Sequence, residues 1–168
     1  RTLSLQSADP PPPLVNRAML ALLANTGRFQ AMTQLLEKMH EEGGDDLLKL
    51  HDFTRAMEAS VRGKRPEIAL KVWDLMLRWR GLGGLDDVMD VVDQKTFRLA
   101  MRALANGRQA RKALSLLETM RMAGTPPTRV EYNYALKACE KGGATSVAIE
   151  ILDDMSRWGI VPDRRTFS

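Results

Sequence analysis

Aromatic residues are scarce in this chain, cysteine occurs once, and no apolar run is long enough to cross a bilayer. Aromatic residues make up only 5% of the sequence, while Met, Leu and Ala are abundant, a composition that favours helices over strands. The lone Cys139 excludes an internal disulfide. No apolar stretch approaches the ~18 residues that a transmembrane helix needs, so we expect no membrane insertion.

The sequence also lacks the groups of residues on which catalysis, zinc binding and phosphate loops depend. His40 and His51 have no cysteine pair with which to hold zinc and no nucleophile to activate. Gly81, Gly83 and Gly84 are not followed by the lysine of a phosphate-binding loop. We therefore predict no enzyme activity in this stretch, no cofactor and no metal.

A repeat of 35 residues is the main feature that the sequence does contain, because residues 129–163 restate residues 94–128. The matching positions are Phe97 and Tyr132, Ala113 and Ala148, Met120 and Met155, Gly124 and Gly159, and Pro127 and Pro162. A fixed period between about 20 and 50 residues is typical of solenoids, whose units bury their apolar surface against neighbours. The sequence therefore predicts an all-α solenoid and a function based on surface recognition.

The same spacing extends towards the N-terminus and gives a complete division of the chain. Residues 1–12 form a polar and proline-rich entry, followed by repeat units at about 13–49, 50–84 with an insertion at 85–93, 94–128 and 129–163, and by the start of a fifth unit at 164–168. Helical hairpins are expected at about 14–43, 50–80, 95–124 and 129–159. We expect the chain to be a piece of a longer protein.

The unit 129–163 shows how one hairpin is built. Tyr132, Leu136 and Cys139 form one apolar stripe at helical spacing. Gly142 and Gly143 close this first helix, because glycine accepts the left-handed cap conformation. A second helix follows at 146–158, and its inward residues are predicted to be Ala148, Ile151, Leu152 and Met155, with Gly159 and Pro162 ending it.

Positive charge is concentrated in one unit. Residues 94–128 carry seven cations against the single carboxylate of Glu118, a balance of +6, whereas the other units are near neutral or slightly acidic. Such a patch suits phosphate. A solvated basic helix face explains the same pattern equally well.

These repeats resemble a known family. Tyr132-Asn133, Gly143, Ala148-Ile149, Met155, Gly159-Ile160 and Pro162-Asp163 resemble the pentatricopeptide repeat consensus at its length of 35 residues. The resemblance implies a right-handed superhelix of helical hairpins. It also implies binding of single-stranded RNA in mitochondria or chloroplasts, with one base read per repeat by two or three side chains.

In that family the fifth and last residues of a repeat face the edge of the base. The resemblance makes Asn133 and Asp163 such a pair, of the kind that favours uridine, and Val130 the aliphatic side chain that sandwiches the base. Thr54 with Asp93 is the nearest equivalent in unit 50–84, of the kind that favours guanine. The fifth-place residues Arg17 and Arg98 fall outside the usual code, and a purely local hydrogen-bonding role for Asn133 remains open.

Contacts to the RNA backbone depend less on the code. Arg62 and Lys141 occupy the thirteenth place, which approaches phosphate in the family, and Arg98 and Arg102 add charge on the first helix of their unit. Phosphate contacts supply affinity without sequence information. Ordinary surface charge is the alternative reading of all four.

Two features favour a protein partner instead. The insertion carries Leu85, Val88 and Met89 among aspartates, and Trp79 and Trp158 share the thirtieth place of their repeats. Packing against their own repeats accounts for these residues equally well. The aspartates lack the glycine and closing glutamate of a calcium loop.

Two functions follow from the sequence. One is an organellar RNA-binding module in RNA processing, stability or translation. The other is a structural subunit that docks proteins in a large organellar assembly such as a ribosome, with little base-specific reading.

Overall fold

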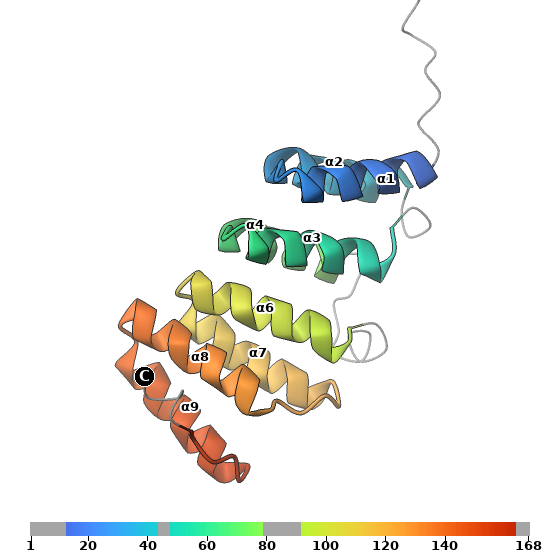
Figure 1. Cartoon of the computed structure of the whole chain (residues 1–168). Coiled ribbons are helices and arrows are strands. Elements are labelled where there is room, and N and C mark those ends of the chain that lie inside the picture. Colours follow the sequence, from blue (N-terminus) through green and yellow to red (C-terminus); the bar gives the residue numbers. More distant parts are fainter. Residues whose placement is uncertain (1–12, 44–47, 79–91, 164–168) are drawn as a thin grey trace, which may run out of the picture.

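The computed structural model describes residues 13–43, 48–78 and 92–163 of the chain. Over these residues the chain forms helices joined by turns, and successive helices pair into hairpins (Figure 1). The helices are α1 (Pro13–Asn25), α2 (Phe29–Gly43), α3 (Leu50–Arg62), α4 (Pro66–Arg78), α6 (Gln94–Asn106), α7 (Ala110–Met122), α8 (Arg129–Gly142) and α9 (Thr145–Arg157). These bounds confirm the four hairpins that the repeat spacing predicts.

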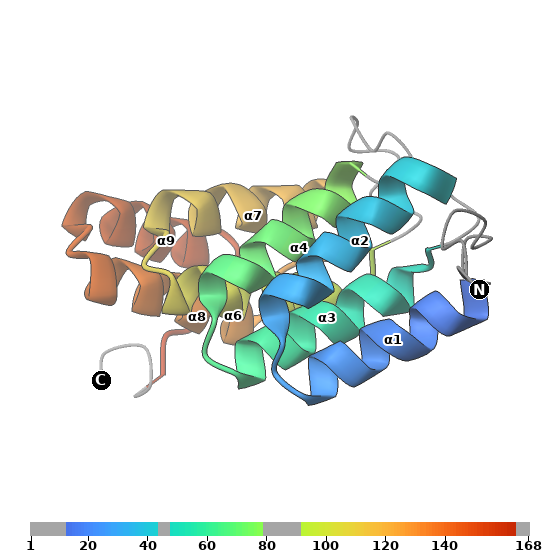
Figure 2. The same cartoon turned by 90° about the horizontal axis from the view of Figure 1, so that it is seen from above.

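The hairpins stack in sequence order, as expected of a solenoid. The first helices α1, α3, α6 and α8 contact one another successively, and among the second helices α2 contacts α4 and α7 contacts α9. Seen from above, the first helices line one side of the stack and the second helices the other (Figure 2). Each side of the stack therefore presents equivalent repeat positions in order along the molecule.

One apolar core runs through the whole stack. The aromatic residues at equivalent places in three first helices, Phe53, Phe97 and Tyr132, are buried. Trp73 on α4 packs against Phe97 of the following hairpin, with 5.9 Å between ring centroids. Because this core joins each hairpin to the next, no single hairpin buries its apolar surface alone.

Small residues allow the two helices of a hairpin to approach closely. Ala69 and Ala113 are fully buried at the equivalent place of α4 and α7. In α9 the predicted inward set is confirmed, because Ile151 and Met155 are fully buried and Ala148 and Leu152 are partly buried and pack against the same core. Ala148 and Leu152 lie at the end of the described stack, where the described residues place no further hairpin against them.

The predicted helix ends are confirmed. Gly143 follows α8 with a φ of 66°, and its N–H reaches the carbonyls at the end of that helix. Gly159 has a φ of 69° just after α9. Glycine reaches this left-handed region without the steric cost of a Cβ. Within the described ranges, no helix has the length and apolar character that crossing a membrane requires.

Candidate nucleic-acid interface

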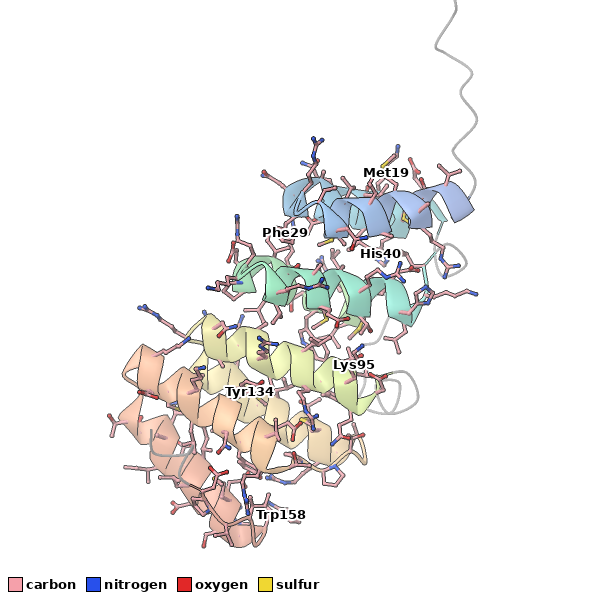
Figure 3. All side chains as sticks on the ribbon, in the orientation of Figure 1. Met19, Phe29, His40, Lys95, Tyr134 and Trp158 are labelled. Atoms are coloured by element: carbon pink, nitrogen blue, oxygen red, sulfur yellow. The ribbon has the colours of Figure 1, made fainter. Side chains whose placement is uncertain are left out.

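The side of the stack formed by α1, α3, α6 and α8, here called the first-helix face, carries an excess of basic side chains. Lys95 on α6 and Tyr134 on α8 mark this side in Figure 3. Its exposed cations include Arg55, Arg62, Lys95, Arg102, Lys137 and Lys141. The carboxylates on these helices are Asp52 and Glu131, which are buried, Glu58, which is half-buried, and Glu140, which is exposed. An anionic ligand would therefore meet mostly positive charge on this face.

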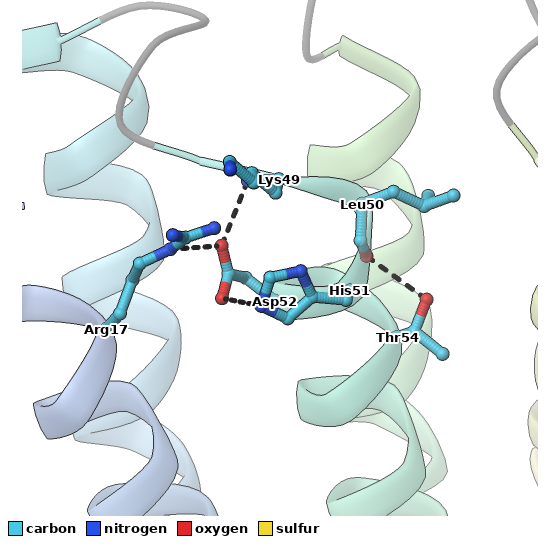
Figure 4. Close-up of polar contacts among 6 residues, drawn as sticks. All are labelled: Arg17, Lys49, Leu50, His51, Asp52 and Thr54. Atoms are coloured by element: carbon cyan, nitrogen blue, oxygen red, sulfur yellow. Dashed lines mark hydrogen bonds and ion pairs between the residues drawn. The ribbon is translucent and has the colours of Figure 1, made fainter. Parts of the chain in front are cut away.

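The fifth residue of a repeat contacts the third residue of the next repeat at each described junction. Arg17 Nε lies 3.2 Å from Asp52 Oδ2 between α1 and α3 (Figure 4). Arg98 Nε lies 2.8 Å from Glu131 Oε1 between α6 and α8.

At the junction between these two, the same places are occupied by hydroxyls. Thr54 Oγ1 and Thr96 Oγ1 are 3.2 Å apart. The residues at the places that read bases in the resembled family thus also tie successive hairpins together.

The third-place residues are held because they also organise the start of their own helices. Asp52 Oδ2 accepts a hydrogen bond of 2.9 Å from the backbone N–H of Lys49, and Glu131 Oε2 accepts one of 2.7 Å from the N–H of Thr128. This reach back to the N-cap satisfies a donor that the helix leaves unpaired. The side chain of Glu131 is 0% exposed. Its carboxylate therefore serves a helix start and a hairpin junction at once.

The environment of Glu131 favours its charged form. Burial raises the pKa of Glu131, but hydrogen bonds from Thr128 and Arg98 outweigh burial and hold the pKa below its ordinary value of 4.5. Arg98 is therefore paired with a carboxylate that stays ionised at neutral pH. The Arg98 guanidinium is therefore already engaged by the Glu131 carboxylate within the protein.

Thr54 and Asp93 lie beside a groove on the first-helix face. The groove has a volume of about 560 Å³, and its lining includes Lys49, His51, Thr54, Asp93 and Lys95. Asp93 Oδ1 accepts hydrogen bonds of 2.9 Å and 2.6 Å from the backbone N–H and the hydroxyl of Thr96. The structure thus brings Thr54 and Asp93 to one site, and links them through Thr96. Reading of guanine by this pair stays a prediction.

The other predicted RNA contacts lie on the first helices α3, α6 and α8, except Asp163, which follows α9. Asn133 on α8 is half-buried, Val130 at the start of α8 is exposed, and Asp163 after α9 is half-buried. Their action on one base stays a prediction, as do the phosphate contacts. Of the latter, Arg62, Arg102 and Lys141 are exposed, whereas Arg98 is half-buried.

Comparison with known sequences agrees with this architecture. The sequence profile of the pentatricopeptide repeat domain matches residues 90–142, and that of the PPR repeat matches residues 132–160. Residues 90–160 of the chain therefore match the pentatricopeptide repeat family. The two profiles meet on α8, the helix that carries Val130 and Asn133.

Similar pentatricopeptide repeat proteins are found among plant sequences and structures. Two mitochondrial pentatricopeptide repeat-containing proteins of Arabidopsis thaliana, At5g14820 and At3g62540, are each 26% identical over 109 residues, which is 65% of this chain and 16% of each relative. The crystal structure of the pentatricopeptide repeat protein PPR10 from maize superposes with a TM-score of 0.67 at 21% identity, covering 96% of this chain and 21% of that one. The chain thus spans about a sixth to a fifth of the length of these proteins.

A second polar cluster, which sequence reasoning missed, joins the last two described repeats on the second-helix side. Arg121 of α7 pairs with Asp154 of α9 and donates to the hydroxyl of Tyr132, which in turn donates a hydrogen bond of 2.8 Å to Asp154 Oδ2. The Arg121 guanidinium also stacks over the ring of Trp158, 4.6 Å from its centroid. The repeat pattern gave no signal for this cluster, because its members come from three helices.

The cluster bears on the predicted docking residues. Trp158 is 57% exposed, and Arg121 lies over its ring, so the tryptophan contributes to a repeat junction. Docking of a protein on Trp158 stays a prediction. Trp79, Leu85, Val88 and Met89 lie outside the described residues.

Metal ligation and thiol chemistry have little basis in the described parts of the chain. Within 13–43, 48–78 and 92–163, no group of three His, Cys, Asp or Glu side chains is arranged to hold a metal ion. Burial raises the pKa of the Cys139 thiol above its ordinary value. Cys139 is therefore a packing residue of the apolar stripe on α8, as its spacing predicts.

Proposed function

We propose that this chain is an RNA-binding module of an organellar pentatricopeptide repeat protein, acting in RNA processing, stability or translation. The observation that supports this function is the run of exposed cations on the first-helix face. Arg55, Arg62, Arg102, Lys137 and Lys141 succeed one another along α3, α6 and α8. The phosphates of an extended single-stranded RNA can contact such a row of cations, and each contact between a cation and a phosphate adds affinity that does not depend on the base sequence.

The proposed compartment is the mitochondrion. The relatives from Arabidopsis thaliana carry "mitochondrial" in their names, and the repeats of this chain are of the same family. A chloroplast location is the alternative. Expression of a full-length, fluorescently tagged protein decides between the two by its co-localisation with one organelle or the other.

The junction contacts argue for limited base reading. Arg17, Thr54 and Arg98 occupy fifth places, yet each contacts the third-place residue of the next repeat. A base edge would have to compete with these contacts. We therefore propose that the described repeats bind RNA mainly through its backbone. Asn133 is the candidate for a base-specific contact, because with Asp163 it matches the family code.

Salt titration of RNA binding tests this function. The affinity for a single-stranded RNA should fall steeply with salt, and replacing Arg55 and Arg102 with Ala should lower the slope by roughly one for each phosphate that the protein no longer neutralises. Replacing Lys38 and Arg157 with Ala is the matched control, because both are exposed and lie on second helices. If both double variants lower the salt slope equally, the first-helix face is not the surface that binds RNA.

The alternative function is a structural subunit that docks proteins in an organellar assembly. The same junction contacts favour it, because they use the fifth-place side chains for the stability of the stack. A chain that shows no salt-dependent RNA affinity, but co-purifies with a stable assembly in defined stoichiometry, would support this alternative.

A further inference from the structure

Every described hairpin places one residue in the left-handed backbone region at the same point of its turn. These residues are Gly27, Lys64, Arg108 and Gly143, with φ values of 71°, 57°, 60° and 66°. Each is the fifteenth residue of its repeat. Glycine adopts this conformation freely, whereas a residue with a Cβ is strained there. The two middle repeats thus carry a cation at a position where the two outer repeats carry the favoured residue.

The strained cations belong to a larger basic surface, here called the turn edge. It comprises the turns within the four hairpins and the helix ends beside them, residues 25–30, 62–67, 106–112 and 140–146. These turns follow one another along a single edge of the stack, on the left in Figure 1. Eight exposed cations lie on it, namely Arg28, Arg62, Lys64, Arg65, Arg108, Arg111, Lys112 and Lys141.

Few charges on the turn edge oppose these cations. The carboxylates in the same four stretches are Glu67 and Glu140. Glu67 is engaged by Arg65, whose Nε lies 2.5 Å from Glu67 Oε1. The turn of the third hairpin, with Arg108, Arg111 and Lys112, has no carboxylate in its stretch. The turn edge is therefore most positive in the two hairpins that carry the strained cations.

The backbone and the surface shape of this edge also suit an anion. Helices α7 and α9 begin here without a side-chain cap and without an acidic residue in their first turn, so no side chain at their own start neutralises their N-terminal amides. Between the first two turns lies a hollow of about 650 Å³, lined among others by Arg28, Gln30, Thr33 and Arg65. Basic and neutral polar side chains dominate this lining.

The turn edge lacks the aromatic platforms on which unpaired bases stack. Phe29 is the aromatic residue in the four stretches, and its ring packs on Gly63, where a Cβ would lie 2.3 Å from Phe29 Cζ. Proteins that hold single strands combine basic grooves with exposed aromatic side chains, whereas double-helical RNA is recognised through its shape, phosphates and 2′-hydroxyls. A row of cations without stacking surfaces fits the second kind of ligand.

We propose that the turn edge, centred on Lys64 and Arg108, binds the sugar–phosphate backbone of double-helical RNA. This site is separate from the first-helix face, although Arg62 and Lys141 lie where the two surfaces meet. The strain at Lys64 and Arg108 is then the cost of placing a cation at the tip of each middle turn. A transcript with a paired segment next to a single-stranded one would engage both surfaces.

A double substitution tests the proposal with the fold as an internal check. Lys64→Gly with Arg108→Gly installs the residue that the first and fourth repeats have, so the thermal midpoint of the 168-residue chain should hold or rise. Binding is measured for an RNA duplex of about 16 base pairs in two unrelated sequences, and for one of its single strands, between about 50 and 200 mM salt. The control is Lys38→Gln with Arg157→Gln, which removes the same charge from exposed sites on α2 and α9.

The expected result is a weaker affinity for both duplexes and a salt slope smaller by about two, one for each phosphate that is no longer neutralised, with single-strand binding and the control unchanged. Unchanged duplex binding, or an equal loss in the control, would overturn the proposal. An equal loss for duplex and single strand would assign the turn edge to single strands and overturn it as well. Single-strand binding that is absent in every variant would instead count against the first-helix face.

Discussion

Arg98 and Glu131 form an ion pair across two successive hairpins, with 2.8 Å between Nε and Oε1. Arg17 and Asp52 make the equivalent contact two junctions earlier, at 3.2 Å. In both cases the carboxylate also accepts a backbone hydrogen bond at the start of its own helix. The fifth-place arginines therefore bind the stack together through buried carboxylates, in the position from which the family contacts bases.

Substitutions of Arg98 and Arg102 should affect the free energy of unfolding differently. Arg98→Ala leaves the buried Glu131 without its cationic partner, and because Arg98 is 43% exposed we expect a loss of only about 1 kcal/mol of unfolding free energy. Arg102→Ala changes an exposed side chain and should stay within about 0.5 kcal/mol of the parent. Urea unfolding measures both changes.

The same two variants should rank oppositely in RNA binding. Arg102→Ala should lower the salt slope for single-stranded RNA by roughly one, whereas Arg98→Ala should lower it less, because its guanidinium is shared with Glu131. A full drop in slope for Arg98→Ala without a loss of stability would show that Arg98 contacts phosphate rather than the next hairpin.

Glu131 should make the stack sensitive to acid. Its folded-state pKa lies below the ordinary value of 4.5, so between these two values the unfolded chain binds more protons than the folded one. The stabilisation from Glu131 is then complete above about pH 4.5 and is lost as the pH falls through the lowered pKa. Glu131→Gln should be less stable than the parent at pH 7, and the difference should narrow below about pH 4.5. Urea unfolding across this range measures it, and a constant difference would contradict the role of the charge.

The fold could be predicted from the sequence because each hairpin is specified by local patterns that recur. The Phe97/Tyr132 match and Ala113 mark buried positions, and Gly143 and Gly159 mark the helix ends. The incomplete burial of Ala148 and Leu152 was not foreseen, because the pattern specifies which side of α9 is apolar but not whether a further hairpin covers it.

The candidate site was predictable only in part. The family register placed Thr54 and Asp93 in one site, yet it gave no sign that Thr96 joins them, because that contact depends on the distance between two stacked helices. The Arg121 and Trp158 stacking was hidden for the same reason. The left-handed Lys64 was also unforeseen, since a turn without glycine at the expected place does not reveal its backbone angles.

Asp93 should reveal its two roles through two substitutions. Asp93→Ala removes the side chain that caps α6 through Thr96, at a cost of about 0.5–2 kcal/mol. Asp93→Asn keeps a capping oxygen and should keep most of that stability. Replacing the neighbouring Gln94 with Ala is the control, since Gln94 is exposed.

If the Thr54/Asp93 pair reads guanine, Asp93→Asn should change the base preference at one RNA position while thermal unfolding stays close to the parent. Equal losses of stability in the Ala and Asn variants would refute the capping role.

Asn133 with Asp163 is the pair that matches the family code without adjustment, and it should prefer uridine at one position of a bound RNA. Asn133→Ser with Asp163 kept should move that preference towards guanine, because the shorter hydroxyl leaves room for the larger base. A good base contact is worth about 1–3 kcal/mol by analogy with duplex readout, so competition among RNAs that differ at one position resolves the change. Asn106→Ser is the control, the same substitution at the thirteenth place of unit 94–128, which in the family approaches phosphate and not the base edge, so the base preference should not change. If Asn133→Ser and the control leave the same preference, Asn133 acts within the protein alone, and the structural-subunit function becomes the better account of this chain.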